Sequence, residues 1–114
     1  MTMDDPAPAM VLRPFGSTGL VVTPIGLGLA ALGRPAYIDL GRPNDLGAQR
    51  DVEALRARTH DVLDAAFALG VRYVDAARSY GRAEEFLADW IGAHPSEASE
   101  LTIGSKWGYA YTGE

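Results

Sequence analysis

The alternation of helical and extended patterns after residue 50 is the strongest constraint on the fold. Apolar residues recur at helical spacing over residues 51–69, and a second such stripe covers residues 83–91. Each stripe is followed by a short run rich in β-branched and aromatic residues, at 71–77 and 101–107. Strands that alternate with helices form βαβ units, so the pattern predicts a parallel sheet.

A different pattern opens the chain. Two apolar runs flank Gly16-Ser17-Thr18-Gly19, which predicts a β-hairpin with a four-residue loop. Pro14 and Pro24 lie in these runs, so the hairpin strands should be short or lie at an edge. Residues 1–10 are predicted to be disordered. Residues 25–33 are predicted to form a buried strand that ends in a loop, and residues 34–49 a long loop.

The predicted order is hairpin, strand, loop, helix, strand, helix, strand. A complete barrel of eight βα units needs about 250 residues, and this chain has 114. No helix follows the last predicted strand to cover its apolar face. We therefore expect an α/β fold in which residues 11–114 form the N-terminal hairpin, the first three strands and two helices of a (β/α)₈ TIM barrel, incomplete as given.

Composition excludes several kinds of site. The sequence contains 0 cysteines, so it has no disulfide framework and no thiolate metal site. His60 and His94 are too few and too far apart for a histidine-rich metal centre. The net charge of -5 argues against a nucleic-acid partner.

The sequence also argues against a membrane location. No run reaches the roughly 18 apolar residues that a membrane span needs. Asp4 and Asp5 stand where a secretory signal would carry Lys or Arg. We expect a cytoplasmic protein that contacts neither membrane nor nucleic acid, and the sequence leaves its oligomeric state open.

Two charged residues stand near the ends of predicted strands. Ligands of parallel α/β folds bind at the carboxyl ends of the strands, and Asp75 and Lys106 lie there. Helices cover the outside of such a barrel, so both side chains should point inward. Burying either charge alone is costly, so we expect the two to pair. Such a pair serves chemistry or only fixes the strand register, and these two residues leave both interpretations open.

Tyr80 adds a third polar group at the same end of the sheet. It follows Asp75 by five residues, in the predicted loop between strand and helix. A tyrosine hydroxyl is a poor acid at neutral pH, and a neighbouring ammonium stabilises its phenolate. Asp75 would hold Lys106 charged and in place, so the trio fits a proton donor with its tuning pair. The alternative is an ordinary loop aromatic at the solvent edge.

At this point the residues resemble a known family. Residues 75–84 read D-A-A-R-S-Y-G-R-A-E and are similar to the aldo-keto reductase signature D-x-A-x-x-Y-G-x-x-E. The lysine of L-T-I-G-S-K-W-G resembles the lysine on that family's third strand. Residues 13–28 resemble its first strand and the hairpin that closes the bottom of its barrel. The three matches occur in order and together span nearly all of residues 12–108.

The resemblance implies an NADP(H)-dependent oxidoreductase. Such enzymes interconvert carbonyls (aldehydes, ketones, sugars) and alcohols by hydride transfer, with a tyrosine as general acid and base. Asp75, Tyr80 and Lys106 match three members of the family's catalytic set of Asp, Tyr, Lys and His. The family's histidine follows its fourth strand and would lie beyond Glu114, and neither His60 nor His94 can replace it. We therefore expect this chain to be inactive alone.

The resemblance also implies binding residues. Gly28, at the end of the first strand, leaves room for the cofactor, which Asp75 also contacts. Trp107 and Tyr37 would line the substrate pocket. Gly26 and Gly28 belong to a G-x-G-x-x-A run, but the following Gly and Pro residues deny it the helix that a dinucleotide-binding loop needs. We instead expect Gly26 to serve packing.

Two other functions remain possible from the sequence. A barrel lyase could use Lys106 as a Schiff-base nucleophile, which requires a lowered lysine pKa that Asp75 would oppose. A non-catalytic subunit, or a truncated relic of the reductase fold, is the other alternative. In the leading interpretation the partner is a small-molecule carbonyl or alcohol.

Overall fold

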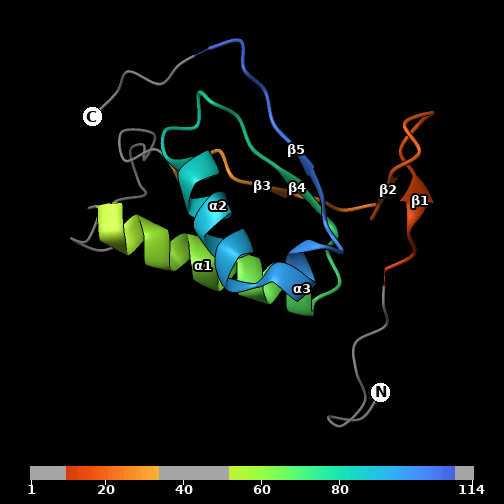
Figure 1. Ribbon diagram of the computed structural model, residues 1–114, viewed down its shortest axis with the longest axis horizontal. Coiled ribbons are helices and arrows are strands. Elements are labelled where there is room, and N and C mark those ends of the chain that lie inside the picture. Colours follow the sequence, from red (N-terminus) through yellow and green to blue (C-terminus); the bar gives the residue numbers. More distant parts are fainter. Residues whose placement is uncertain (1–9, 34–51, 110–114) are drawn as a thin grey trace, which may run out of the picture.

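A computed structural model describes residues 10–33 and 52–109 (Figure 1). Most of the predicted disorder at 1–10, the predicted loop at 34–49, and Tyr37 lie outside these ranges. Within them, the predicted order of elements is confirmed, with one additional short helix. No helix in this part of the chain is long and apolar enough to cross a membrane.

The N-terminal hairpin has the predicted four-residue loop. β1 (Arg13–Pro14) pairs antiparallel with β2 (Val21–Val22). The loop is closed by the Phe15 amide, which donates to the Leu20 carbonyl at 2.9 Å. The glycines at both ends of the loop, Gly16 and Gly19, have φ of 58° and 81°, a region that glycine occupies without steric cost.

Three parallel strands form the second sheet, as the βα alternation predicts. β3 (Leu27–Gly28), β4 (Tyr73–Asp75) and β5 (Thr102–Gly104) lie in that order, with β4 in the centre. The regular strands are shorter than the predicted runs at 71–77 and 101–107. Backbone hydrogen bonds nevertheless continue from Ala76 to Gly104 and from Arg78 to Lys106, each at 2.8 Å. The segments beyond the strands therefore stay side by side.

The two long helices lie where the apolar stripes predict them. α1 (Val52–Ala68) ends shortly before Gly70, whose φ of 97° is the left-handed conformation common just after helix C-termini. α2 (Ala83–Ala93) ends at His94. Pro95 then begins a one-turn helix, α3 (Pro95–Ala98), which the sequence pattern did not predict. Proline favours the first helical position, so it both stops α2 and starts α3.

The core lies between the helices and one face of the second sheet (Figure 1). Val74 of β4 is 2% exposed. Its neighbours in the chain, Tyr73 and Asp75, alternate to the opposite face, which we call the inner face. The buried side chains that pack together come from β3, α1, β4 and α2 and the segments next to them: Leu29, Leu63, Val74, Ala76, Ala83, Leu87 and Trp90.

The helical cover of the sheet is incomplete. Ile103 of β5 stands opposite Val74 in the register, yet it is 39% exposed. Among the described residues no helix covers β5, as expected from the order of elements.

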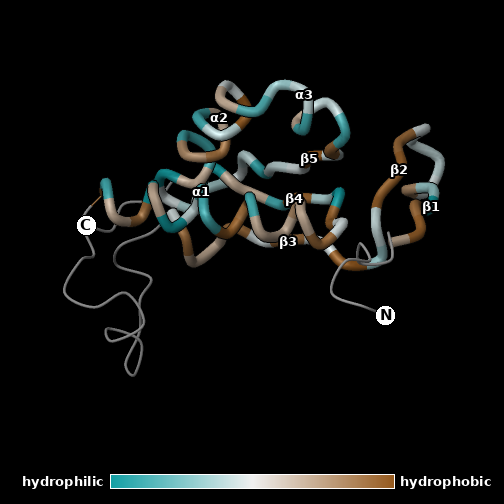
Figure 2. Tube along the Cα trace, turned by 90° about the horizontal axis from the view of Figure 1, so that it is seen from below, coloured by the Kyte–Doolittle hydropathy of each residue, from teal (hydrophilic) through white to brown (hydrophobic). Residues whose placement is uncertain are grey.

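The hairpin is attached to the amino ends of the parallel strands. The Thr102 hydroxyl donates to the Val21 carbonyl at 2.6 Å, and the rings of Phe15 and Tyr73 lie 5.5 Å apart. The Thr23 hydroxyl accepts the Arg72 amide at 3.0 Å. The hairpin thus lies at the end opposite Lys106. Figure 2 shows apolar segments on both hairpin strands, and several of their side chains, among them Leu20 and Val21, are exposed.

Gly33 allows a test of the close contact between the segment after β3 and the start of α2. A Cβ there would lie 2.2 Å from the Ala83 nitrogen and 2.3 Å from the Tyr80 oxygen, both backbone atoms. We expect Gly33→Ala to lower the free energy of unfolding by about 1–3 kcal/mol, as overpacking does. Urea denaturation would measure this loss.

Gly92→Ala is the matched control. Gly92 belongs to α2, and apart from the helix's own backbone no described atom lies within 4 Å of its Cβ position. This variant should gain about 0.5–1 kcal/mol from helix propensity. Equal stability of the Gly33→Ala variant and the unchanged protein would contradict the close approach.

Candidate functional site

The predicted ion pair is present at the carboxyl ends of β4 and β5. The Lys106 ammonium donates to Asp75 Oδ1 at 2.6 Å and to the Ala76 carbonyl at 2.9 Å. Asp75 is the last residue of β4, and Lys106 follows the end of β5 by two residues. Parallel pairing of the two strands brings the side chains together although 31 residues separate them.

Tyr80 lies beside this pair. The Lys106 nitrogen is 5.1 Å from the centroid of the Tyr80 ring. Tyr80 is half-buried and packs against the core, within a turn in which its amide donates to the Ala77 carbonyl at 3.0 Å. The turn between β4 and α2 therefore brings all three predicted catalytic residues to one place.

The charge on Lys106 is stabilised by its neighbours. Its pKa is raised above the ordinary value of 10.5, chiefly because the ammonium donates a hydrogen bond to Asp75. Partial burial acts in the opposite direction, while the charge of Asp75 and the nearby Tyr80 raise the pKa further. Lys106 is therefore a cation at neutral pH.

An open hollow borders Asp75 on the inner face. Its volume is about 560 Å³, within the roughly 300–1,000 Å³ of small-molecule sites. Gly28 stands opposite Asp75 in the register, and beyond its chain neighbours no described atom lies within 4 Å of where its Cβ would be. At Gly26, by contrast, a Cβ would lie 2.6 Å from the Tyr73 ring, which agrees with the predicted packing role.

The hollow itself, of about 560 Å³, is open to solvent and has both polar and apolar walls. It lies between the hairpin and the first two parallel strands, and the residues that line it are Val22, Thr23, Pro24, Gly26, Leu27, Gly28, Tyr73 and Asp75. Gly28 and Asp75, the predicted cofactor-binding residues, are thus two neighbouring parts of one concave surface.

Trp107 extends away from the protein next to the ion pair. It follows Lys106 directly, and 84% of its surface is exposed. No described residue forms a closed pocket with it, so its predicted role in substrate binding stays a prediction. Tyr37, the other predicted pocket residue, lies outside the described ranges.

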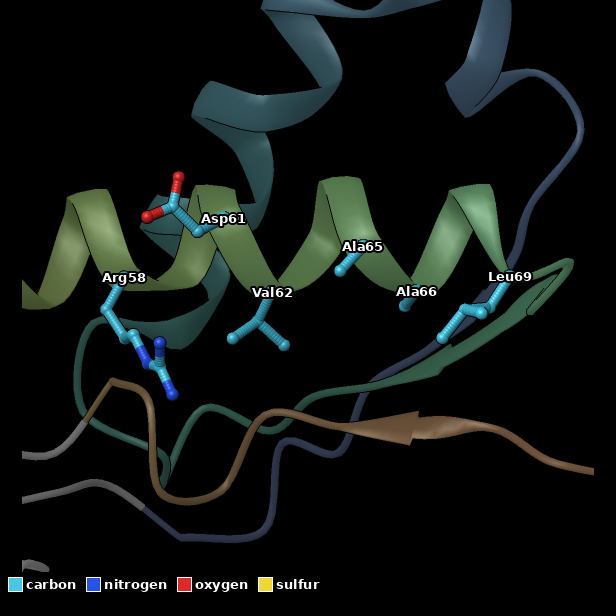
Figure 3. A pocket seen from close by; sticks show the side chains of 6 residues that line it. All are labelled: Arg58, Asp61, Val62, Ala65, Ala66 and Leu69. Atoms are coloured by element: carbon cyan, nitrogen blue, oxygen red, sulfur yellow. The ribbon is translucent and has the colours of Figure 1, made fainter. Parts of the chain in front are cut away.

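A second hollow, of about 360 Å³, runs along α1 (Figure 3). The side chains of Val62, Ala65, Ala66 and Leu69 form its apolar wall, and Arg58 and Asp61 complete the lining. It contains none of the three predicted catalytic residues. Within residues 10–33 and 52–109, no group of three or more His, Asp or Glu side chains is arranged to hold a metal ion.

One polar contact beside Lys106 was not predicted from the sequence. The Ser105 hydroxyl donates to Glu84 Oε2 at 2.5 Å, which joins the end of β5 to the first turn of α2. Glu84 closes the motif at 75–84, and that position was the only signal in the sequence that could have drawn attention to it.

Comparison with known proteins decides the family. The model of the aldo/keto reductase family matches residues 24–114. The chain belongs to this family. The two parallel βαβ crossovers and the hairpin are therefore the N-terminal part of an aldo/keto reductase barrel.

Individual aldo/keto reductase relatives agree with this assignment. A pyridoxal 4-dehydrogenase of Microbacterium luteolum is 36% identical over 104 residues, which are 90% of this chain and 25% of that protein. A crystal structure of a Pseudomonas aeruginosa protein described as an aldo-keto reductase superposes with a TM-score of 0.63 at 31% identity, over 89% of this chain and 32% of the other. A second Pseudomonas aeruginosa structure gives 0.58 at 29% identity, over 83% and 30%.

The chain spans about a quarter of the length of the curated relative and about a third of the solved structures. The described part of the site holds a phenol beside a cation at the edge of an open hollow. Such an arrangement can donate a proton to an oxygen that gains negative charge.

The origin of the raised lysine pKa can be tested directly. We expect Asp75→Asn to lower the pKa of Lys106 toward 10.5, because the hydrogen bond to the carboxylate is its largest cause. NMR titration of the Lys106 side chain would measure the change. Asp61→Asn, which removes the same charge from an exposed position on α1, should leave the Lys106 pKa unaltered.

The raised pKa of Lys106 also determines the pH range in which this residue stabilises the folded protein. Because the folded-state pKa lies above the unfolded-state value, Lys106 contributes stability below pH 10.5. That contribution disappears as the pH rises through the raised pKa. An unchanged Lys106 titration in the Asp75→Asn variant would show that the ion pair does not form in solution.

Proposed function

We propose that this chain supplies the proton-transfer residues of an NADP(H)-dependent oxidoreductase that interconverts carbonyls and alcohols. The observation that carries the proposal is the position of the Lys106 ammonium, 2.6 Å from Asp75 and 5.1 Å from the Tyr80 ring. This trio stands at the carboxyl ends of parallel strands, where α/β barrels bind their substrates. Membership of the aldo/keto reductase family supports the same reaction class.

The inner face has room for a nicotinamide cofactor. Gly28 presents open space at the end of β3, and Asp75 lies across from it on the wall of the same hollow. In the proposal these two residues contact the nicotinamide end of NADP(H). When bound, that group supplies the hydride for the carbonyl carbon.

In the proposal, the residues of this chain transfer the proton. The Tyr80 hydroxyl donates its proton to the substrate oxygen as that oxygen becomes an alkoxide. Lys106 stabilises the phenolate that is left, and Asp75 keeps Lys106 charged and in place. In the reverse direction the Tyr80 phenolate accepts the proton of the alcohol.

The electrostatics of Lys106 oppose the alternative Schiff-base lyase. A Schiff base needs a neutral amine, and enzymes that form one lower the pKa of the lysine. Here Asp75 raises the pKa of Lys106, so the nitrogen stays protonated at neutral pH. A lyase would reveal itself by a stable lysine adduct after borohydride reduction in the presence of a carbonyl substrate.

The proposed substrates are small aldehydes, ketones and sugars. The exposed indole of Trp107, next to Lys106, offers a flat apolar surface for their carbon skeleton. Pyridoxal belongs in the test panel because it appears in the name of a relative that is 36% identical.

Tyr80→Phe tests the proposed proton donor in the full-length protein. We expect kcat for aldehyde reduction to fall by about 10²–10⁴-fold, which is the usual contribution of a general acid. The Kd for NADPH, measured by fluorescence titration, should change by no more than about twofold, because the hydroxyl acts only on the substrate oxygen. Tyr109→Phe, at an exposed position, is the control and should keep full activity.

Turnover by the Tyr80→Phe variant within a few-fold of the unchanged protein would refute the role of Tyr80. Absence of NADPH oxidation by the unchanged full-length protein, with every carbonyl tested, would favour a non-catalytic subunit instead.

Trp107→Ala tests the proposed substrate surface. We expect KM for aromatic aldehydes to rise about fivefold, because one stacking contact is lost, while kcat for small aliphatic aldehydes is retained. Trp107→Phe should restore most of the affinity. Equal KM values for aromatic aldehydes in all three proteins would exclude Trp107 from the substrate pocket.

A further inference from the structure

We infer that Glu84 and Ser105 form a positioning pair that holds Lys106 beside Tyr80. The inference rests on the proposed function, since it concerns how the cation is kept next to the proton donor. Its basis is the hydrogen bond of 2.5 Å from the Ser105 hydroxyl to Glu84 Oε2.

The hydrogen bond joins the two segments that carry the proposed catalytic groups. Ser105 immediately precedes Lys106, and Glu84 follows Tyr80 by four residues in the first turn of α2. A side-chain contact between these segments restrains the position of the lysine relative to the tyrosine, because Ser105 adjoins Lys106 and Glu84 is four residues from Tyr80.

Two partners hold the ammonium of Lys106: Asp75 at 2.6 Å and the Ala76 carbonyl at 2.9 Å. The backbone of Lys106 is the part that Ser105 adjoins. It lies beyond the regular part of β5, where its carbonyl accepts the Arg78 amide at 2.8 Å. About half of its side chain is exposed, at 53%. A flexible lysine stem loses considerable rotamer entropy when it is held in one geometry, so a fixed backbone next to it favours the productive position.

The neighbouring Glu85 has a different set of partners. Its carboxylate pairs with Arg56 of α1 at 2.9 Å and with Arg82 at 3.3 Å. Both glutamates occupy the first turn of α2, where a negative charge interacts favourably with the helix dipole. Glu85→Ala therefore removes the same charge from the same turn without touching Ser105.

The electrostatics of Lys106 help to separate position from charge. Asp75 and Tyr80 are the groups that raise its pKa, and Glu84 is not among them. A change in the Lys106 pKa on replacing Glu84 would thus report a displaced ammonium.

The test uses five variants of the full-length protein: Glu84→Ala, Glu84→Gln, Ser105→Ala, the double variant Glu84→Ala with Ser105→Ala, and Glu85→Ala. Glu84→Ala and Ser105→Ala should each lower kcat about tenfold, since small misplacements of catalytic groups are costly. KM should stay within about twofold. The double variant should be no worse than either single one, because both remove the same contact.

Two variants distinguish positioning from a general loss of structure. Glu84→Gln keeps an oxygen that accepts the Ser105 proton, so it should retain kcat within about twofold. Glu85→Ala should do the same. Equal losses in the Glu84→Ala and Glu85→Ala variants, additive losses in the double variant, or failure of Glu84→Gln to retain activity would each overturn the inference.

An NMR titration of Lys106 separates this inference from the proposed function. If the unchanged protein reduces no carbonyl, the proposed function fails, and the titration then decides the positioning role. A fall of the Lys106 pKa toward 10.5 in Glu84→Ala, with no fall in Glu85→Ala, supports the pair. The same pKa in both variants overturns it.

Discussion

The rest of the structure depends on the position of β4 between two parallel neighbours. Its three residues alternate between two environments: Val74 enters the core, while Tyr73 and Asp75 face the other side. The hydrogen-bonded register with β5 places Asp75 opposite Gly104. The backbone hydrogen bonds of Ala76 and Arg78 beyond the strands keep Lys106 close to the Asp75 carboxylate. One short strand thus separates the apolar core from the polar site.

The site differs from an ordinary surface ion pair by its surroundings. An exposed lysine–carboxylate pair contributes at most about 1 kcal/mol to stability. Here the Lys106 ammonium also donates to the Ala76 carbonyl and lies 5.1 Å from the centroid of the Tyr80 ring. Asp75 lines the open hollow on the inner face. This arrangement keeps a cation next to a phenol, as the proposed proton transfer requires.

Local patterns predicted the features that local physics determines. The helical stripe predicted α1, and the position of Asp75 and Lys106 at the carboxyl ends of parallel strands predicted their pairing. Strand lengths were overestimated, because the apolar pattern continues beyond the regular ladder. α3 was missed, since four residues are too few to show a helical period. The contact of Ser105 with Glu84 joins residues 21 apart and leaves no periodic trace.

The hydrogen bond from Thr102 to Val21 has a consequence for the order of folding. It links residues 81 apart in the sequence, while the hairpin itself needs only contacts within its own ten residues. Closing so long a loop costs more entropy than closing a turn, and contacts between distant residues slow folding. The contact of Phe15 with Tyr73 needs only β4, so during synthesis it can form before the Thr102 hydrogen bond, which needs β5.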